Sequence, residues 1–130
     1  MDKNTVLSAI DQHKTCTINA LRRSQHAGTD DGEFGHYGRP GRIPGSVNLP
    51  TVELVDPTTM EFLAAEEIRA RLDALGASDA SRVITYCGGG IAASATAMLL
   101  VLLGHQNVGL YDASLSEWAI DATLPMQTDG

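Results

Sequence analysis

The sequence lacks the long apolar segments that would place it in or across a membrane. Its longest uninterrupted apolar run, at 97–103, is far shorter than the roughly 20 residues that a transmembrane helix needs. The first residues, 1–5, do not contain the apolar core of a secretory signal peptide. The sequence therefore predicts a cytoplasmic protein with no membrane partner.

Positive charge is also scarce. Nine lysines and arginines stand against 16 aspartates and glutamates, which gives a formal net charge of −7 at pH 7. A field of this sign repels nucleic-acid phosphates and acidic lipid surfaces, so we expect no nucleic-acid partner. The 130 residues are 43% hydrophobic and 19% charged, which is typical of a soluble globular protein that forms one domain over 1–130.

Cysteine is limited to Cys16 and Cys87, and neither lies in a CxxC motif. The histidines, at 13, 26, 36 and 105, show no spacing typical of metal ligands, so the sequence predicts no metal site and no cofactor. Cys16 lies early in one predicted strand and Cys87 ends another. In neighbouring parallel strands this offset is about three residues, or roughly 10 Å, which is too far for a disulfide. We therefore expect Cys16 to be structural.

Short strand-like and helix-like segments alternate along the chain. Strands are predicted at 15–19, 82–87 and 108–111, a short buried segment at 47–49, and helices at 5–11, 64–76, 92–103 and 114–118. This alternation predicts an α/β fold with a central parallel sheet of about five strands, flanked by helices on both faces. The segment 22–46 has no hydrophobic period, which indicates a long functional loop.

Two of the predicted helices carry further expectations. The helix at 92–103 is apolar nearly all round, which indicates deep burial. We also expect Met98, Tyr111 and Trp118 to belong to the core. The Ser-Leu-Ser-Glu sequence at 114–117 matches a capping box, in which a serine hydroxyl caps the first turn of the helix that it begins.

The strongest candidate for chemistry is the place where a predicted strand passes into the apolar helix. Cys87 ends the strand, and the glycines 88–90 connect it to the helix. In open parallel α/β sheets, ligands bind beyond the carboxyl ends of the strands. Glycine lets the backbone curl, so the N–H groups of residues 88–93 can converge on the sulfur and favour the thiolate, the reactive nucleophile. We expect a larger side chain at Gly89 or Gly90 to prevent this geometry.

Two other loop chemistries do not fit these residues. Thiol-dependent phosphatases place an arginine six or seven residues after the cysteine, where this chain has Ala93 and Ser94. A nucleotide-binding P-loop needs a lysine and then a serine or threonine after its last glycine, but Ile91 and Ala92 follow Gly90. The sequence therefore disfavours both a phosphatase and a Walker-type nucleotide site.

Three separated motifs resemble the rhodanese family of sulfurtransferases, and within it the catalytic domain of 3-mercaptopyruvate and thiosulfate sulfurtransferases. The motifs are 41–50, 86–93 and 110–118, in the order in which the family has them. The resemblance implies a rhodanese-like fold in which Cys87 takes a sulfane sulfur, as a persulfide, from a small anionic donor such as thiosulfate or 3-mercaptopyruvate. It implies a thiol or cyanide as acceptor, including a thioredoxin-like protein.

The loop argument and the resemblance together define the candidate site residues. Cys87 is the candidate catalytic residue. The candidate substrate-binding residues are Gly88, Gly89, Gly90, Ile91, Ala92, Ala93, Arg22 and Arg42. The two arginines belong to the segment 22–46, where a local basic rim would recruit an anionic donor.

The sequence departs from the family pattern where the mercaptopyruvate branch grips its substrate. One arginine of that branch aligns with Leu21 and another falls at Ala27, while Gly89 stands where the branch has a serine. One hypothesis is an active sulfurtransferase, stand-alone or half of a tandem enzyme, in which Arg22 or Arg23 replaces the missing arginines. The other is a persulfide carrier or regulatory module that does not turn over, and the lost arginines favour it.

Overall fold

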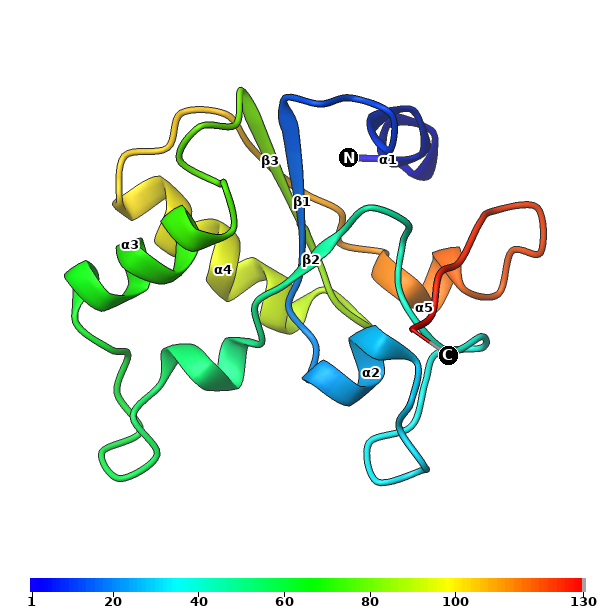
Figure 1. The fold of residues 1–130 in the computed structure, drawn as a ribbon, viewed down its shortest axis with the longest axis horizontal. Helices are drawn as coiled ribbons and strands as arrows, with labels where there is room; N and C mark the ends of the chain where they lie inside the picture. Colours follow the sequence, from blue (N-terminus) through cyan, green and yellow to red (C-terminus); the bar gives the residue numbers. More distant parts are fainter. Residues whose placement is uncertain (130) are drawn as a thin grey trace.

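The computed structural model describes residues 1–129 and shows a parallel sheet with helices on both faces (Figure 1). The strands are β1 (Thr15–Asn19), β2 (Val47–Asn48), β3 (Arg82–Tyr86) and β4 (Val108–Leu110). They lie in the order β2-β1-β3-β4, and every neighbouring pair is parallel. The expected α/β class is confirmed, and within the described residues the sheet has four strands, close to the number expected.

Six helices connect and cover these strands in the described part of the chain. They are α1 (Lys3–Ala9), α2 (Arg23–Ala27), the 3-10 helix η1 (Thr51–Leu54), α3 (Ala65–Ala74), α4 (Ile91–Leu102) and α5 (Ser114–Trp118). Helices α3 and α4 lie on one side of the sheet, whereas α1 and α5 lie on the other (Figure 1). The segment 22–46, predicted as loop throughout, contains the five-residue helix α2, which Gly28 ends in a left-handed conformation.

The central strand β3 is buried on both faces, as a parallel sheet covered by helices requires, whereas the edge strands β2 and β4 are half-buried. Val83 and Ile84 are neighbours in β3 and point to opposite sides, because side chains alternate along a strand. On one side Ile84 packs in a core with residues of α1 and α5. On the other, Val83 packs with residues of β1, α3 and α4. Tyr111 and Trp118 are fully buried, so their predicted core positions are confirmed.

Helix α4 is buried along one face only, so the expectation that it is buried all round is wrong. Ala93, Thr96, Leu99 and Leu100 form the buried face. On the opposite face Met98 is 50% exposed and Leu102 is 72% exposed. The apolar composition of a helix reports what it can bury, whereas its actual burial depends on the elements that pack against it. No helix among residues 1–129 is both long and apolar enough to cross a membrane.

The register of β1 and β3 places the two cysteines far apart along the strands. Cys16 lies opposite Val83, four residues before Cys87 in the sequence. Both cysteines are free thiols. Burial raises the pKa of Cys16, which disfavours its thiolate form. The predicted offset is therefore confirmed, and Cys16 lies within the fold as a half-buried side chain.

Candidate active site

Cys87 directly follows β3 and begins a four-residue loop that ends where α4 begins. The residue is only 3% exposed, and it lines a cavity. The Gly90 N–H donates a hydrogen bond to Cys87 Sγ at 3.0 Å. Among the described residues 1–129, Gly90 is the residue whose N–H donates to that sulfur. One of the main-chain amides expected to converge on Cys87 is therefore directed at it.

Helix α5 holds the cysteine loop through its first N–H groups. Leu115 N–H donates to the carbonyl oxygen of Cys87 at 3.1 Å, and Ser116 N–H donates to that of Gly88 at 2.9 Å. The Ser116 hydroxyl donates to the same Gly88 oxygen at 2.7 Å. In a trans peptide the N–H points opposite to the C=O. The N–H groups of Gly88 and Gly89 therefore point away from α5.

Ser114 attaches the cysteine itself to the start of α5. Its hydroxyl accepts the Cys87 N–H at 3.0 Å and donates to the Tyr111 carbonyl at 2.8 Å. Ser114 is fully buried and has a φ of 54°, a left-handed conformation that is unusual for a residue other than glycine. The capping-box prediction is wrong: the hydroxyl holds the cysteine loop, and the Glu117 carboxylate accepts the Tyr111 hydroxyl instead.

The three loop glycines have different structural roles. Gly90 has a φ of +97°, and a Cβ there would lie 2.6 Å from the carbonyl oxygen of Asp112. A Cβ on Gly88 would overlap the ring of Tyr37. Gly89 has neither restriction, since its φ lies outside the left-handed region and nothing lies within 4 Å of its Cβ position. The steric expectation is thus confirmed for Gly90 and wrong for Gly89.

Cys87 lines a cavity of about 400 Å³ with mostly apolar walls. Its lining residues are Leu21, Tyr37, Cys87, Gly88, Gly89, Ile91 and Ala92. Five of the predicted site residues therefore meet here, Gly90 lies next to them, and Ala93 is buried with its carbonyl accepting the Thr85 hydroxyl. Tyr37 was not predicted, because nothing in the segment 22–46 indicates which of its residues returns to the cysteine loop. Leu21 lines the cavity at the position where the mercaptopyruvate branch has one of its arginines.

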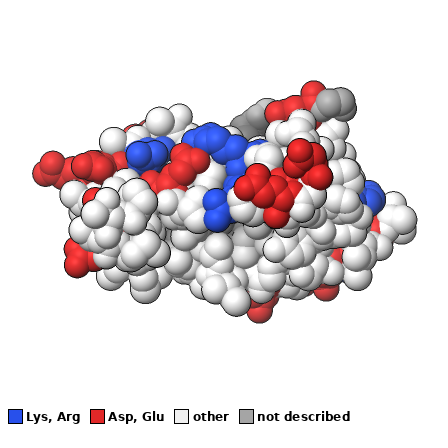
Figure 2. All heavy atoms as spheres, turned by 90° about the horizontal axis from the view of Figure 1, so that it is seen from below, with Lys and Arg blue, Asp and Glu red and all other residues white. Residues whose placement is uncertain are grey.

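The loop arginines contact other parts of the protein. The Arg42 guanidinium binds Asp129 at 2.7 Å and the His26 carbonyl at 3.1 Å. The Arg22 guanidinium lies over the Phe34 ring, 4.1 Å from its centre. Basic side chains do gather on the face seen in Figure 2, with acidic ones on either side. Neither Arg22 nor Arg42 lines the cavity, so their contact with substrate stays a prediction.

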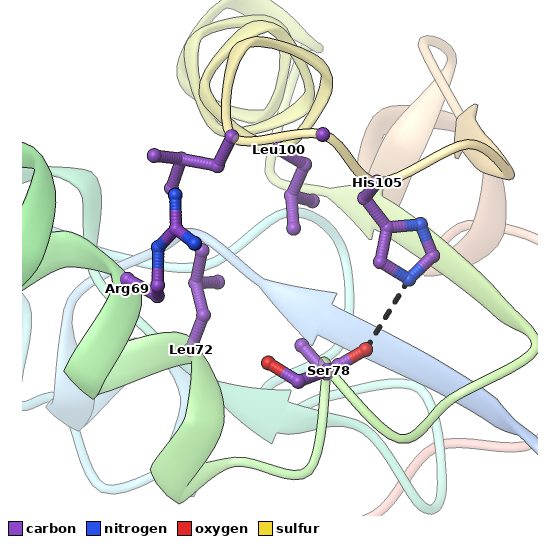
Figure 3. A pocket seen from close by; sticks show the side chains of 8 residues that line it. Arg69, Leu72, Ser78, Leu100 and His105 are labelled. Carbon is purple, nitrogen blue, oxygen red and sulfur yellow. Dashed lines mark hydrogen bonds between the residues drawn. The ribbon is translucent and has the colours of Figure 1, made fainter.

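A second cavity, of about 200 Å³, lies at the other end of α4 (Figure 3). Both ring nitrogens of its histidine have hydrogen-bond partners: Nε2 of His105 is 3.2 Å from the Ala77 carbonyl, and Nδ1 accepts the Asn107 N–H. Its serine, Ser78, donates to Asp73. His105 and Ser78 therefore stabilise local turns at this cavity. The cavity at Cys87, which combines a thiol with main-chain donors, is the candidate active site.

Comparison with known families agrees with this geometry. Residues 17–121 match the rhodanese-like domain, and this range contains most of β1, the strands β2, β3 and β4, the cysteine loop and α5. The chain belongs to the rhodanese-like domain family. Both the resemblance seen in the sequence and the fold it implied are confirmed.

Curated relatives of this rhodanese-like domain are named for sulfur transfer or sulfur carriage. The chain is 37% identical to the 3-mercaptopyruvate sulfurtransferase of Escherichia coli K12 over 89 residues, which cover 68% of this chain and 31% of the relative. It is 37% identical over 90 residues to the mitochondrial thiosulfate/3-mercaptopyruvate sulfurtransferase 1 of Arabidopsis thaliana, covering 69% and 24%. It is 37% identical over 89 residues to the sulfur carrier protein TtuD of Thermus thermophilus, covering 68% and 31%. The chain thus spans about a third or less of the length of these relatives.

Solved structures share the fold over nearly the whole rhodanese-like domain. The Tum1 protein of Saccharomyces cerevisiae superposes with a TM-score of 0.79 at 25% identity, covering 99% of this chain and 46% of that one. An anaerobic ergothioneine biosynthesis enzyme from Chlorobium limicola gives a TM-score of 0.86 at 19% identity, covering 98% and 31%. At that identity the second likeness shows the fold alone.

Proposed function

We propose that this domain transfers sulfane sulfur through a persulfide on Cys87. The observation that carries the proposal is the Gly90 N–H on Cys87 Sγ, at 3.0 Å, in a loop that opens onto a cavity. A main-chain amide that donates to a sulfur stabilises negative charge on it without a metal or a side-chain base. The same amide lies beside the position where a bound persulfide would carry its charge.

The proposed reaction consists of two displacements at sulfur. The Cys87 thiolate attacks the transferable sulfur of a small anionic donor of the thiosulfate or 3-mercaptopyruvate type. With thiosulfate, the S–S bond breaks and its electron pair leaves with sulfite. With 3-mercaptopyruvate, the C–S bond breaks and its electron pair forms the enolate of pyruvate, which takes up a proton. In the second step a thiol or cyanide attacks the outer sulfur of the persulfide. The S–S bond between that sulfur and Cys87 Sγ breaks, and Cys87 leaves as the thiolate. No external oxidant or reductant is needed, because in each step the electron pair of the broken bond stays with the leaving group.

The loop contributes a fixed geometry to both steps. The carbonyls of Cys87 and Gly88 are held by α5, and the Cys87 N–H is held by Ser114. The loop therefore needs little rearrangement as charge moves between donor and sulfur, which is how preorganised dipoles lower a barrier. We place the reaction in the cytoplasm and expect a thioredoxin-like protein among the thiol acceptors.

A second candidate is a persulfide carrier that does not turn over by itself. The cavity lining favours it, because it contains no arginine to hold an anionic donor. Both candidates need the persulfide, but only the first needs release to a small acceptor at a catalysed rate.

Intact mass and turnover measured together test the proposal. We expect one added sulfur atom on the wild-type chain after incubation with thiosulfate or 3-mercaptopyruvate, and none on Cys87→Ser. Cys16→Ser is the matched control and should load like the wild type. Cys16 is half-buried and lies opposite Val83, four residues before Cys87. Loading followed by turnover supports the enzyme, and loading without turnover supports the carrier. If Cys87→Ser loads as well as the wild type, the proposal is wrong.

A further inference from the structure

We infer that the cavity at Cys87 selects a small thiol acceptor whose body is uncharged and apolar. This inference rests on the proposed function and specifies the chemical class of its acceptor. The starting observation is the wall of the cavity, where Leu21, Tyr37, Ile91 and Ala92 surround the loop and no lysine, arginine, aspartate or glutamate is present.

The nearby arginines are engaged elsewhere. Arg23 forms a two-pronged ion pair with Glu53, at 2.6 and 2.8 Å. Arg39 donates to main-chain carbonyls of the segment 118–124. Arg22 and Arg42 are held by Phe34 and Asp129, as described above. A charged acceptor would therefore lose water in the cavity without gaining an ion pair, which is unfavourable.

An anionic donor meets the same walls, but the Gly90 N–H, 3.0 Å from Sγ, stabilises the charge that its transferring sulfur carries. The acceptor's sulfur must approach the outer sulfur of the persulfide from the open side, so its carbon body extends outward along the walls. Those walls include Ile91, which is 88% exposed at the mouth of the cavity. An apolar body covers this exposed surface, and burial of apolar surface is favourable.

The step that the cavity selects is balanced in atoms and electrons. The acceptor thiolate attacks the outer sulfur of the Cys87 persulfide and forms a new S–S bond. The original S–S bond breaks, and its electron pair remains on Cys87 Sγ. The products are the acceptor persulfide and the free cysteine thiolate.

Two thiols of the same shape test the inference. The full chain is first loaded with sodium tetrasulfide, so that the result does not depend on the natural donor. Loss of the added sulfur is then followed by intact mass after addition of 3-methylbutane-1-thiol or 3-mercaptopropionate, which differ in an apolar or a charged end. Each rate is divided by that of the same thiol with a small-molecule persulfide. We expect the apolar thiol to react at least about tenfold faster, a ratio typical of selection by an apolar pocket.

High salt and two variants distinguish selection by the cavity from repulsion by the net charge of −7. The preference should persist at 1 M salt, where long-range repulsion is screened. In Ile91→Arg the charged thiol should gain at least about tenfold relative to the apolar one, while Ile91→Gln should lower the apolar rate without raising the charged one. Because Ile91 is so exposed, neither change should affect folding.

The outcomes distinguish this inference from the proposed function. Loading with equal normalised rates for the two thiols would overturn the acceptor class and leave sulfur transfer through Cys87 intact. A preference that disappears at 1 M salt would assign the selection to net charge and also overturn the inference. If tetrasulfide and the anionic donors all fail to load Cys87, the proposed function is wrong and the acceptor class is rejected with it.

Discussion

Ser114 links Cys87 to Tyr111, the residue that follows β4, and β4 is the neighbour of β3 in the sheet. Its hydroxyl lies between the Cys87 N–H and the Tyr111 carbonyl, and both groups are buried. Ser114 is therefore a positioning residue, which acts on the reaction through the backbone of Cys87. Its left-handed φ of 54° shows that the surrounding contacts outweigh a local strain of about 1 kcal/mol or more.

Replacement of Ser114 separates the hydroxyl from the strain. Ser114→Ala leaves two buried main-chain groups without a partner, so we expect the free energy of unfolding to fall by about 1–3 kcal/mol. We also expect kcat for sulfur transfer to fall about tenfold with little change in KM, because the loop is displaced while the walls of the cavity remain. Urea denaturation and steady-state kinetics measure the two effects.

Ser114→Gly is the matched variant for this test. It loses the same hydroxyl but adopts a positive φ without strain, so it should be about 1 kcal/mol more stable than Ser114→Ala. Its kcat should be as low as that of Ser114→Ala. A kcat equal to the wild type in either variant would show that the hydroxyl has only a structural role.

At the scale of elements, two neighbouring glycines of the cysteine loop differ in the space that a side chain would have. Gly90→Ala places a methyl group 2.6 Å from the Asp112 oxygen at a φ of +97°, so we expect a loss of about 1–3 kcal/mol in stability and of most sulfur transfer. Gly89→Ala meets nothing within 4 Å and should remain within about 0.5 kcal/mol of the wild type. Thermal unfolding and persulfide loading of the two variants check this. Equal behaviour of the pair would contradict the loop geometry.

The end of β3 is connected to the motif at 43–46 by one hydroxyl. Tyr86 Oη accepts hydrogen bonds from Asn19 Nδ2 at 2.9 Å and from Ile43 N–H at 3.0 Å, and it lies 2.7 Å from the Ser46 hydroxyl. Tyr86→Phe leaves two buried donors unpaired, so we expect about 1–3 kcal/mol less stability in urea. Amide hydrogen exchange at Ile43 should accelerate more than at Val83, which lies in β3 like Tyr86 but donates its N–H to the main-chain carbonyl of Asn107. Unchanged exchange at Ile43 would show that another group replaces the hydroxyl.

At the scale of the whole molecule, local sequence patterns predict the elements better than the contacts between them. Strands β1 and β3 follow from short β-branched runs, and Cys87 from its glycines before a helix. The position of Tyr37 over Gly88 does not follow, because it depends on the path of a segment without hydrophobic period. The role of Ser114 is hidden for another reason: its local pattern also fits a helix cap, and only the tertiary structure brings Cys87 near.

The same limit applies to residues 127–129, which pack against α2 and the motif at 41–50. Arg42 and Gln127 exchange main-chain hydrogen bonds at 2.9 Å, and Asp129 N–H donates to the Ala27 carbonyl at 2.8 Å. His26 belongs to α2, its carbonyl accepts a hydrogen bond from the Arg42 guanidinium, and its Nδ1 is buried without a hydrogen-bond partner among the described residues. Burial, followed by the positive charge of Arg42, lowers the pKa of His26 to about 4.

This low pKa predicts that acid destabilises the fold through His26. The unfolded chain binds a proton on this histidine near pH 6.5 and the folded chain only near pH 4, so unfolding takes up a proton between these values. Stability is therefore fully present above pH 6.5 and is lost as the pH falls towards 4. One pKa unit corresponds to about 1.4 kcal/mol, and partial exposure of the ring reduces the effect, so we expect a loss of about 1–2 kcal/mol.

His26→Leu isolates this contribution from the carboxylates, whose loss of stability comes at lower pH. The pKa of Asp121, for example, is lowered to about 2 by hydrogen bonds from Thr123 and Lys3. Urea denaturation at intervals between pH 7 and 4 should give a steeper fall in the free energy of unfolding for the wild type than for His26→Leu. Above pH 6.5 the two curves should run parallel, because the histidine is then neutral in both the folded and the unfolded wild type. Parallel curves throughout the range would mean that the His26 ring reaches water through an opening between α2 and residues 127–129.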